Sequence, residues 1–194
     1  MNKPTLFIDV DGVLLDWFNP FHAWMKRQGM RRVRTDSYDM RDSYPSLATA
    51  ELRRLVLDFN QSPAFRDLQP DDDARKALWN IHHELPDWPI RYVSSCGSTA
   101  KIQEARSAQL TGIPSPMMLT CLRLGASKRP IFQQVARAIV VEDSPEQLRV
   151  AEELGHFTVC VRQPWNRIVD GTIRINHLRD LTPEALRKIE KGRE

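Results

Sequence analysis

A short apolar run that stops at two carboxylates constrains this chain more than any other stretch. Residues 6–8 are apolar, Asp9 and Asp11 flank a valine, and Gly12 follows. A brief apolar run closed by glycine is typical of a buried strand. Because open parallel α/β sheets bind ligands at the carboxyl ends of their strands, both acids would lie where a site forms. The alternative is an Asx turn that caps the following helix.

The rest of the chain alternates between strand-like and helix-like segments. We expect further strands in residues 88–95, 117–121, 138–143, 157–161 and 172–175. Helical patterns cover residues 71–84, 98–110, 130–137 and 145–154, and a last helix begins at Pro183 with Thr182 as its cap. This alternation predicts an α/β fold in which right-handed crossovers join the strands of a parallel sheet.

Residues 17–69 interrupt the alternation, because they contain helix and turn signals but no convincing strand. One amphipathic helix follows Asp16, which is expected to cap it, and a second helix covers residues 49–60. We therefore expect a core of residues 1–16 and 70–194 and a small helical cap of residues 17–69, placed to act as a lid. Aromatic residues at helical spacing are expected to pack, with stacking on a ligand as the alternative: Trp17, Phe18, Phe21 and Trp24.

Composition narrows the class of protein and of partner. At 194 residues, with 41% apolar and 27% charged side chains, the chain is typical of a globular protein of one or two domains. The net charge is only +3 and the basic residues are scattered along the chain, which favours a small anionic partner over stable nucleic-acid binding. The separated cysteines Cys96, Cys121 and Cys160 predict free thiols in a reducing cytoplasm. We find no signal-peptide pattern and no apolar run of about 18 residues, so we expect no membrane span.

Polar chemistry also follows two later strands. Ser94 ends one of them, and Glu142 and Asp143 end the strand that comes after Lys128. A sheet that gathers these ends would place four acids in one cleft, where repulsion raises some pKa values unless a cation intervenes. A hard divalent ion such as Mg²⁺ suits oxygen ligands of this kind. With Mg²⁺, Lys128 and one protonated acid, the site would be nearly neutral and would accept a phosphate dianion.

In this order, these features resemble the four motifs of the haloacid dehalogenase (HAD) superfamily of phosphohydrolases. The matching features are Asp-x-Asp-Gly-Val after a strand, a strand that ends in serine, a lysine before a proline-initiated helix, and Val-Val-Glu-Asp-Ser. The resemblance covers residues 1–16 and about 70–194. It implies a Rossmann-like three-layer core with a parallel sheet and a small helical cap inserted after the first strand.

The resemblance also implies a role for each matching residue. Asp9 would be the nucleophile that forms an aspartyl-phosphate, and Asp11 would protonate the leaving oxygen and later activate water. Ser94 and Lys128 would hold the phosphoryl oxygens. Mg²⁺ would be bound by the carboxylates of Asp9, Glu142 and Asp143 and by the main-chain carbonyl of Asp11. Ser95 is the alternative to Ser94, and Arg129 or Lys101 is the alternative to Lys128.

A narrower resemblance concerns the substrate. Residues 65–70 and 84–95 are similar to the end of the cap and the second motif of 5'(3')-deoxyribonucleotidases, and residues 163–167 resemble a loop of nucleotidase-like relatives. The chain departs from that family with three aspartates at 71–73 in place of Pro-Gly-Ala, and its Glu-Asp-Ser is closer to phosphomutase and phosphoglycolate-type members. The resemblance implies hydrolysis of (deoxy)nucleoside monophosphates. The alternatives are a sugar-phosphate or phosphoglycolate-type phosphatase and a catalytically silent relative that binds phosphorylated ligands.

Overall fold

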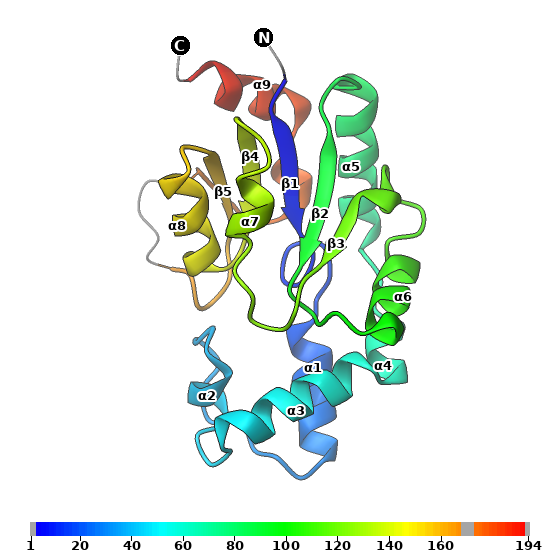
Figure 1. The fold of residues 1–194 in the computed structure, drawn as a ribbon, viewed down its shortest axis with the longest axis vertical. Helices are drawn as coiled ribbons and strands as arrows, with labels where there is room; N and C mark the ends of the chain where they lie inside the picture. Colours follow the sequence, from blue (N-terminus) through cyan, green and yellow to red (C-terminus); the bar gives the residue numbers. More distant parts are fainter. Residues whose placement is uncertain (1–2, 168–172, 193–194) are drawn as a thin grey trace.

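The computed structural model of the chain describes residues 3–167 and 173–192. Within these ranges, all strands join one parallel sheet in the order β3-β2-β1-β4-β5-β6 (Figure 1). In chain order they are β1 Thr5–Asp9, β2 Ile90–Ser94, β3 Leu119–Cys121, β4 Ala138–Glu142, β5 Phe157–Val161 and β6 Ile173–Ile175. The sheet and the helices that cross over it confirm the predicted Rossmann-like α/β class.

Strand β1 lies inside the sheet, between β2 and β4, and both of its faces are covered. All of its residues are buried, as is typical of parallel strands with helices on both sides. Leu6 is in register with Ile90 of β2 on one side and with Ile139 of β4 on the other. The chain first builds outward from β1 to β3 and later from β4 to β6. The strand order therefore reverses between β1 and β4, which is where open α/β sheets bind their ligands.

Helices cover both faces of the sheet. One face is covered by α5 Asp72–Glu84, α6 Ala100–Gln109 and α9 Pro183–Lys191, and the other by α7 Arg129–Phe132 and α8 Pro145–Glu153. On the first face, Ile8 belongs to the same buried cluster as Ile102 and Leu186. On the second, Phe132 packs against Phe7, with ring centroids 5.2 Å apart. Residues of β1 that are adjacent in sequence thus face opposite layers.

The insert between β1 and α5 is helical and lies beyond the carboxyl ends of the strands, in the lower part of Figure 1. Its helices are α1 Phe18–Arg27, α2 Met40–Ser43, α3 Thr49–Asn60 and α4 Pro63–Arg66. The expected helices at the start of the insert and over residues 49–60 are both present. Asp16 accepts a hydrogen bond from the backbone N–H of Asn19 at 3.1 Å, which satisfies one free donor of α1.

Several elements differ from the sequence-based expectation. The short helices α2 and α4 were not predicted, and α4 begins where Ser62 accepts from the N–H of Phe65 and Pro63 occupies the first turn. The helix expected over residues 130–137 ends at Phe132, because the next residues must return the chain to β4. A 3-10 helix, Pro116–Met118, takes the start of the strand expected at residue 117. Of the strand expected over 172–175, residue 172 lies outside the described residues. Across the described ranges, no helix has the length and apolar character needed to cross a membrane.

Candidate active site

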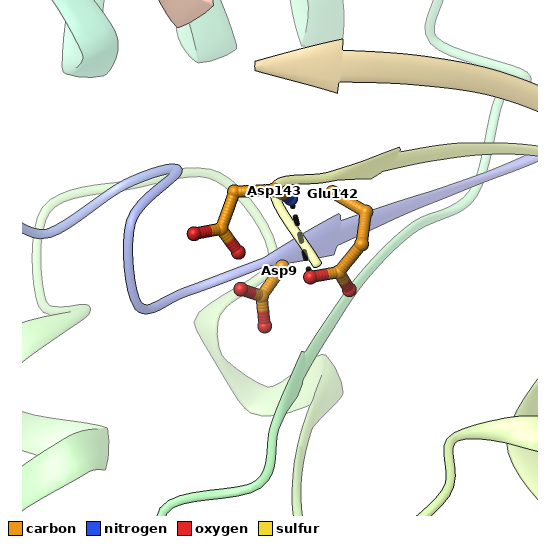
Figure 2. Close-up of side chains that lie close together, drawn as sticks. All are labelled: Asp9, Glu142 and Asp143. Atoms are coloured by element: carbon orange, nitrogen blue, oxygen red, sulfur yellow. Dashed lines mark hydrogen bonds between the residues drawn. The ribbon is translucent and has the colours of Figure 1, made fainter. Parts of the chain in front are cut away.

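Three carboxylates meet at the point where β1 and β4 end. Asp9 is the last residue of β1, Glu142 is the last residue of β4, and Asp143 follows it. Because β1 and β4 are paired side by side, their ends bring the three acids together from distant parts of the chain (Figure 2). One oxygen from each carboxylate lies within 4.8 Å of the others, and all three residues are buried. The sheet therefore places Asp9, Glu142 and Asp143 in one cluster.

Lys128 supplies a positive charge to this cluster. Its Nζ donates a hydrogen bond to Asp9 and another, of 2.6 Å, to Oε2 of Glu142. Its backbone N–H donates to Gln147 Oε1 at 2.9 Å, which fixes the start of the short helix α7. Burial alone would lower the pKa of the Lys128 ammonium, but Asp9 and Glu142 raise it above its usual value. The alternative Arg129 instead pairs with Glu153.

The acid cluster carries more negative charge than Lys128 can balance. Burial, and then repulsion from Glu142, raises the pKa of Asp9 well above its ordinary value. Burial and the charge of Asp9 likewise raise the pKa of Asp143. Both shifts have the sign expected for like charges brought together away from water. One lysine against three carboxylates leaves a net charge that a divalent cation would offset.

The donor set fits a hard divalent cation such as Mg²⁺. Asp143 Oδ2 is buried and has no hydrogen-bond partner among the described residues, which is an unfavourable state unless an ion or water satisfies it. Gly12 leaves room beside this oxygen: with φ at +86°, a Cβ there would lie 2.4 Å from Asp143 Oδ2. Carboxylate oxygens are the ligands that Mg²⁺ prefers. We infer that Asp9, Glu142 and Asp143 would hold the ion, while the main-chain carbonyl of Asp11 stays a prediction.

Asp11 lies beside this cluster but has partners of its own. Arg106 Nη2 donates to Oδ1 and Oδ2 of Asp11 at 2.5 and 2.7 Å. Ser94 Oγ donates to Oδ2 at 3.0 Å. Ser94 is fully buried and does not line the cavity, so the contact expected between its hydroxyl and a phosphoryl oxygen stays a prediction. The neighbouring Ser95 lines the cavity instead, and its Oγ donates to the carbonyl of Ala126 at 3.1 Å.

Arg106 also belongs to the site, although the sequence did not predict it there. It lies in the middle of α6 and is separated from Asp11 by 95 positions along the chain. Nothing in the surrounding residues distinguishes it from an ordinary solvent-facing arginine of a polar helix. The one available signal was its place on the same helical stripe as Ile102, since residues four apart share a face. Only the packing of α6 against the site shows that this arginine points inward.

A cavity of about 480 Å³ opens in front of these residues. Its floor includes Asp9, Asp11, Ser95 and Lys128 from the core. Its other wall comes from the insert and includes Phe18, Tyr38, Met40, Arg41, Thr49, Leu52, Arg53, Val56 and Asn60. Of the aromatic residues expected to pack, Phe21 is fully buried and Trp17 nearly so, and both Trp17 and Phe18 line the cavity. The space is large enough for a small organic phosphate.

The loop of residues 163–167 supports the site through hydrogen bonds and does not line the cavity. Gln163 Nε2 donates to the carbonyl of Gly12 at 2.8 Å. Asn166 Nδ2 donates to the carbonyls of Asp143 and Val161 at 2.9 and 2.8 Å. Trp165 packs on Phe18, with ring centroids 4.2 Å apart. The residues 163–167 that resemble a nucleotidase loop thus hold both acid-bearing turns in place.

Comparison with known proteins bears on the fold. Neither a protein-family model nor a curated protein sequence matches the chain. A HAD hydrolase of family IA, variant 3, from Entamoeba histolytica is similar in structure, with 13% identity, a TM-score of 0.64, and coverage of 97% of this chain and 100% of that one.

Two further structures show the same similarity. A phosphonoacetaldehyde hydrolase like protein from Oleispira antarctica has 14% identity and a TM-score of 0.63 over 99% of this chain and 95% of that one. An archaeal beta-phosphoglucomutase from Pyrococcus sp. has 16% identity and a TM-score of 0.60 over 98% and 100%. At such identities the similarity shows that this chain has the fold of HAD hydrolases.

Proposed function

We propose that the protein is a Mg²⁺-dependent phosphomonoesterase of the HAD type that works through an aspartyl-phosphate on Asp9. The observation that carries this proposal is the convergence of Asp9, Lys128, Glu142 and Asp143 in one buried cluster, of which Asp9 and Lys128 line the cavity. A lone acidic cluster would suit many roles. A buried lysine that touches both the nucleophile and a second acid provides, in addition, the positive charge that phosphoryl transfer requires.

The side chains would divide the reaction as follows. An oxygen of Asp9 attacks phosphorus, the bond from phosphorus to the leaving oxygen breaks, and Asp11 donates a proton to that oxygen. Asp11 then takes a proton from a water molecule, whose oxygen attacks phosphorus and releases inorganic phosphate and free Asp9. Lys128 stabilises the negative charge on the phosphoryl oxygens, with Ser95 as the hydroxyl on the cavity wall. When bound, Mg²⁺ would supply further charge neutralisation at the phosphoryl group.

The insert would act as a cap. We divide the chain into a core of residues 1–16 and 70–194 and a cap of residues 17–69, because the cap supplies the cavity wall opposite Asp9. Trp17 Nε1 donates to Asn60 Oδ1 at 2.8 Å, and Asn60 Nδ2 donates to the carbonyl of Cys96 at 2.7 Å. The first bond joins two residues of the cap, and the second ties the end of α3 to the core.

A (deoxy)nucleoside monophosphate is the substrate that we propose. The cavity volume of about 480 Å³ exceeds the need of inorganic phosphate and leaves space for a sugar and a base. Phe18 and Tyr38 offer aromatic surface on the cap side, which suits a flat base. A sugar phosphate is the second candidate, favoured by the polar Thr49, Arg41 and Arg53 on the same wall. We expect a small metabolite handled in the cytoplasm, without stable nucleic-acid binding.

Phosphate release from p-nitrophenyl phosphate tests the proposal. We expect activity that requires Mg²⁺, is lost with EDTA, and falls by at least about 1,000-fold in Asp9→Asn, because the amide cannot attack phosphorus. Asp16→Asn is the matched control, because it makes the same chemical change at a nearby aspartate that caps α1. An Asp9→Asn variant as active as Asp16→Asn would rule out the aspartyl-phosphate, and a wild type that binds phosphate without turnover would indicate a silent relative.

A substrate panel tests the finer assignment. Nucleoside monophosphates, with and without the 2'-hydroxyl, are compared with hexose phosphates and phosphoglycolate by kcat/KM. We expect the nucleotides to be preferred by at least about tenfold. A clear preference for hexose phosphates would reject the nucleotide assignment while leaving the phosphatase intact. Phe18→Ala should raise KM for nucleotides more than for the small p-nitrophenyl ester.

A further inference from the structure

Arg106 is a charged side chain with no solvent exposure. Burying a charge is strongly unfavourable unless it is paired and hydrogen-bonded. The partner here is Asp11, whose two carboxylate oxygens accept from the same nitrogen, Nη2, at 2.5 and 2.7 Å. Asp11 keeps 21% of its side chain exposed and lines the cavity. Arg106 therefore stands behind Asp11, on the side away from the substrate space.

Other contacts hold the guanidinium still. Nη1 donates to Gln109 Oε1 at 2.9 Å, and the carbon Cζ lies 4.7 Å from the ring centroid of Phe65. Gln109 in turn donates to the backbone carbonyl of Phe65. Phe65 belongs to α4, which ends the insert, whereas Arg106 and Gln109 belong to α6 of the core. The guanidinium thus contacts Gln109 and Asp11 of the core and Phe65 of the insert.

We infer that Arg106 is a positioning residue that fixes the carboxyl group of Asp11 at the edge of the cavity, within reach of the leaving oxygen; this inference rests on the proposed phosphatase function. An arginine that donates hydrogen bonds to both oxygens restricts rotation of the carboxyl group far more than the single hydroxyl of Ser94 does. Proton transfer needs the donor within hydrogen-bond reach of the leaving oxygen, and small misplacements strongly reduce the rate. The contact with Phe65 also links the orientation of Asp11 to the last helix of the insert.

Substrates with different leaving groups distinguish a positioning role of Arg106 from a purely structural one. An alkyl phosphate needs a proton on its leaving oxygen, whereas p-nitrophenolate departs without one. We expect Arg106→Met, which keeps the volume but loses the donors, to lower kcat for an alkyl phosphate on the order of 100-fold with little change in KM. The loss for p-nitrophenyl phosphate should be at least tenfold smaller. Arg106→Lys, which keeps the charge, should recover part of the alkyl activity.

Two comparisons complete the test. In an Asp11→Asn background, Arg106→Met should have almost no additional effect, because residues that act through one another give non-additive losses. Ile102→Ala, on the same buried stripe of α6, should lower thermal stability without changing the ratio of the two kcat values. Equal losses for both substrates, or a full further loss in the Asp11→Asn background, would overturn the inference.

The variants distinguish a folding defect from a loss of catalytic function. If Arg106→Met does not fold, the comparison of Arg106→Lys with Ile102→Ala decides, because only the former should lower alkyl activity selectively. A wild type that hydrolyses neither ester with Mg²⁺ contradicts the proposed function itself. A wild type active on both esters, combined with variants that lose both activities equally, contradicts only the role of Arg106.

Discussion

Gly12 shows how a single residue can be required by its neighbour. Its φ of +86° is a conformation that side chains rarely adopt. Its missing Cβ also leaves space for Asp143 Oδ2, an oxygen of the acid cluster. Most glycines of turns need only the first property. Gly12 needs both, which explains why a glycine follows the two aspartates of the opening stretch.

Substituting this glycine is our prediction at the residue scale. Gly12→Ala should destabilise the protein by about 1–2 kcal/mol through backbone strain and should also push Asp143 out of place, lowering p-nitrophenyl phosphate turnover by about 100-fold. Gly29→Ala is the matched control, because Gly29 has φ of +80° and nothing within 4 Å of an added Cβ. It should show the strain alone. Equal turnover in the two variants, measured beside their unfolding temperatures, would contradict the role given to Asp143.

At the scale of elements, the helices of the insert are stabilised by contacts that the helical pattern does not reveal. Helix α1 buries Phe21 and Met25 against the insert core, and Phe21 stacks on Trp17 with ring centroids 4.6 Å apart. The polar side of α1 also contacts the insert: His22 Nδ1 lies 2.8 Å from the Tyr44 hydroxyl, and this hydrogen bond joins α1 to the end of α2. The insert therefore contains a half-buried histidine between two of its elements.

His22 predicts a pH dependence of stability. Burial, and then the charge of Arg32, lowers the pKa of His22 to about 4, whereas an unfolded histidine titrates near 6.5. As the pH falls below 6.5, the unfolded chain takes up the proton before the folded one does, so folding stability decreases between pH 6.5 and 4. Because the ring is partly exposed, we expect a loss of about 1 kcal/mol from this group by pH 5.

Denaturant unfolding at pH 7.5 and pH 5 measures this contribution. His22→Gln should lose less stability than the wild type over the same interval, whatever its absolute stability. His83→Gln, at an exposed position of α5, is the control and should follow the wild type. If all three proteins lose the same free energy on acidification, His22 is not the group responsible.

At the scale of the whole molecule, the acid cluster joins the two halves of the sheet. Asp9 comes from β1, and Glu142 and Asp143 come from the end of β4, where the strand order reverses. In the absence of a cation, their mutual repulsion opposes the packing of these strands. A bound divalent ion would remove that repulsion and bind the folded chain alone, since the unfolded chain does not assemble the three acids.

Metal removal tests this idea without any substrate. Mg²⁺ at about 100 times its dissociation constant should stabilise the folded state by roughly 2.7 kcal/mol, which corresponds to an increase of about 5–10 °C in unfolding temperature for a chain of this size. EDTA should reverse the increase, and Asp143→Asn should reduce it. Asp16→Asn should retain it. Identical unfolding temperatures in Mg²⁺ and EDTA would mean that the cluster does not bind the ion.

Much of the fold was accessible from the sequence because its signals are local. A short apolar run bounded by turn residues predicts a strand, and amphipathic spacing predicts a helix, from residues that are neighbours in the chain. The helix α3 over Thr49–Asn60 was predicted at its observed bounds for this reason. The short helices α2 and α4 were not predicted, and α7 is shorter than expected, since a single turn of helix carries too little periodicity and depends on tertiary contacts.

The sequence by itself determined which strands end in acids, and hence that Asp9, Glu142 and Asp143 come together once those strands are parallel neighbours. Only the tertiary structure decided which groups face one another across that edge. Ser94 and Ser95 are adjacent, and only their packing shows that the Ser94 hydroxyl donates to Asp11 while Ser95 lines the cavity. Arg106 reaches Asp11 only because α6 packs over this end of the sheet, and such long-range packing leaves no local pattern in the chain.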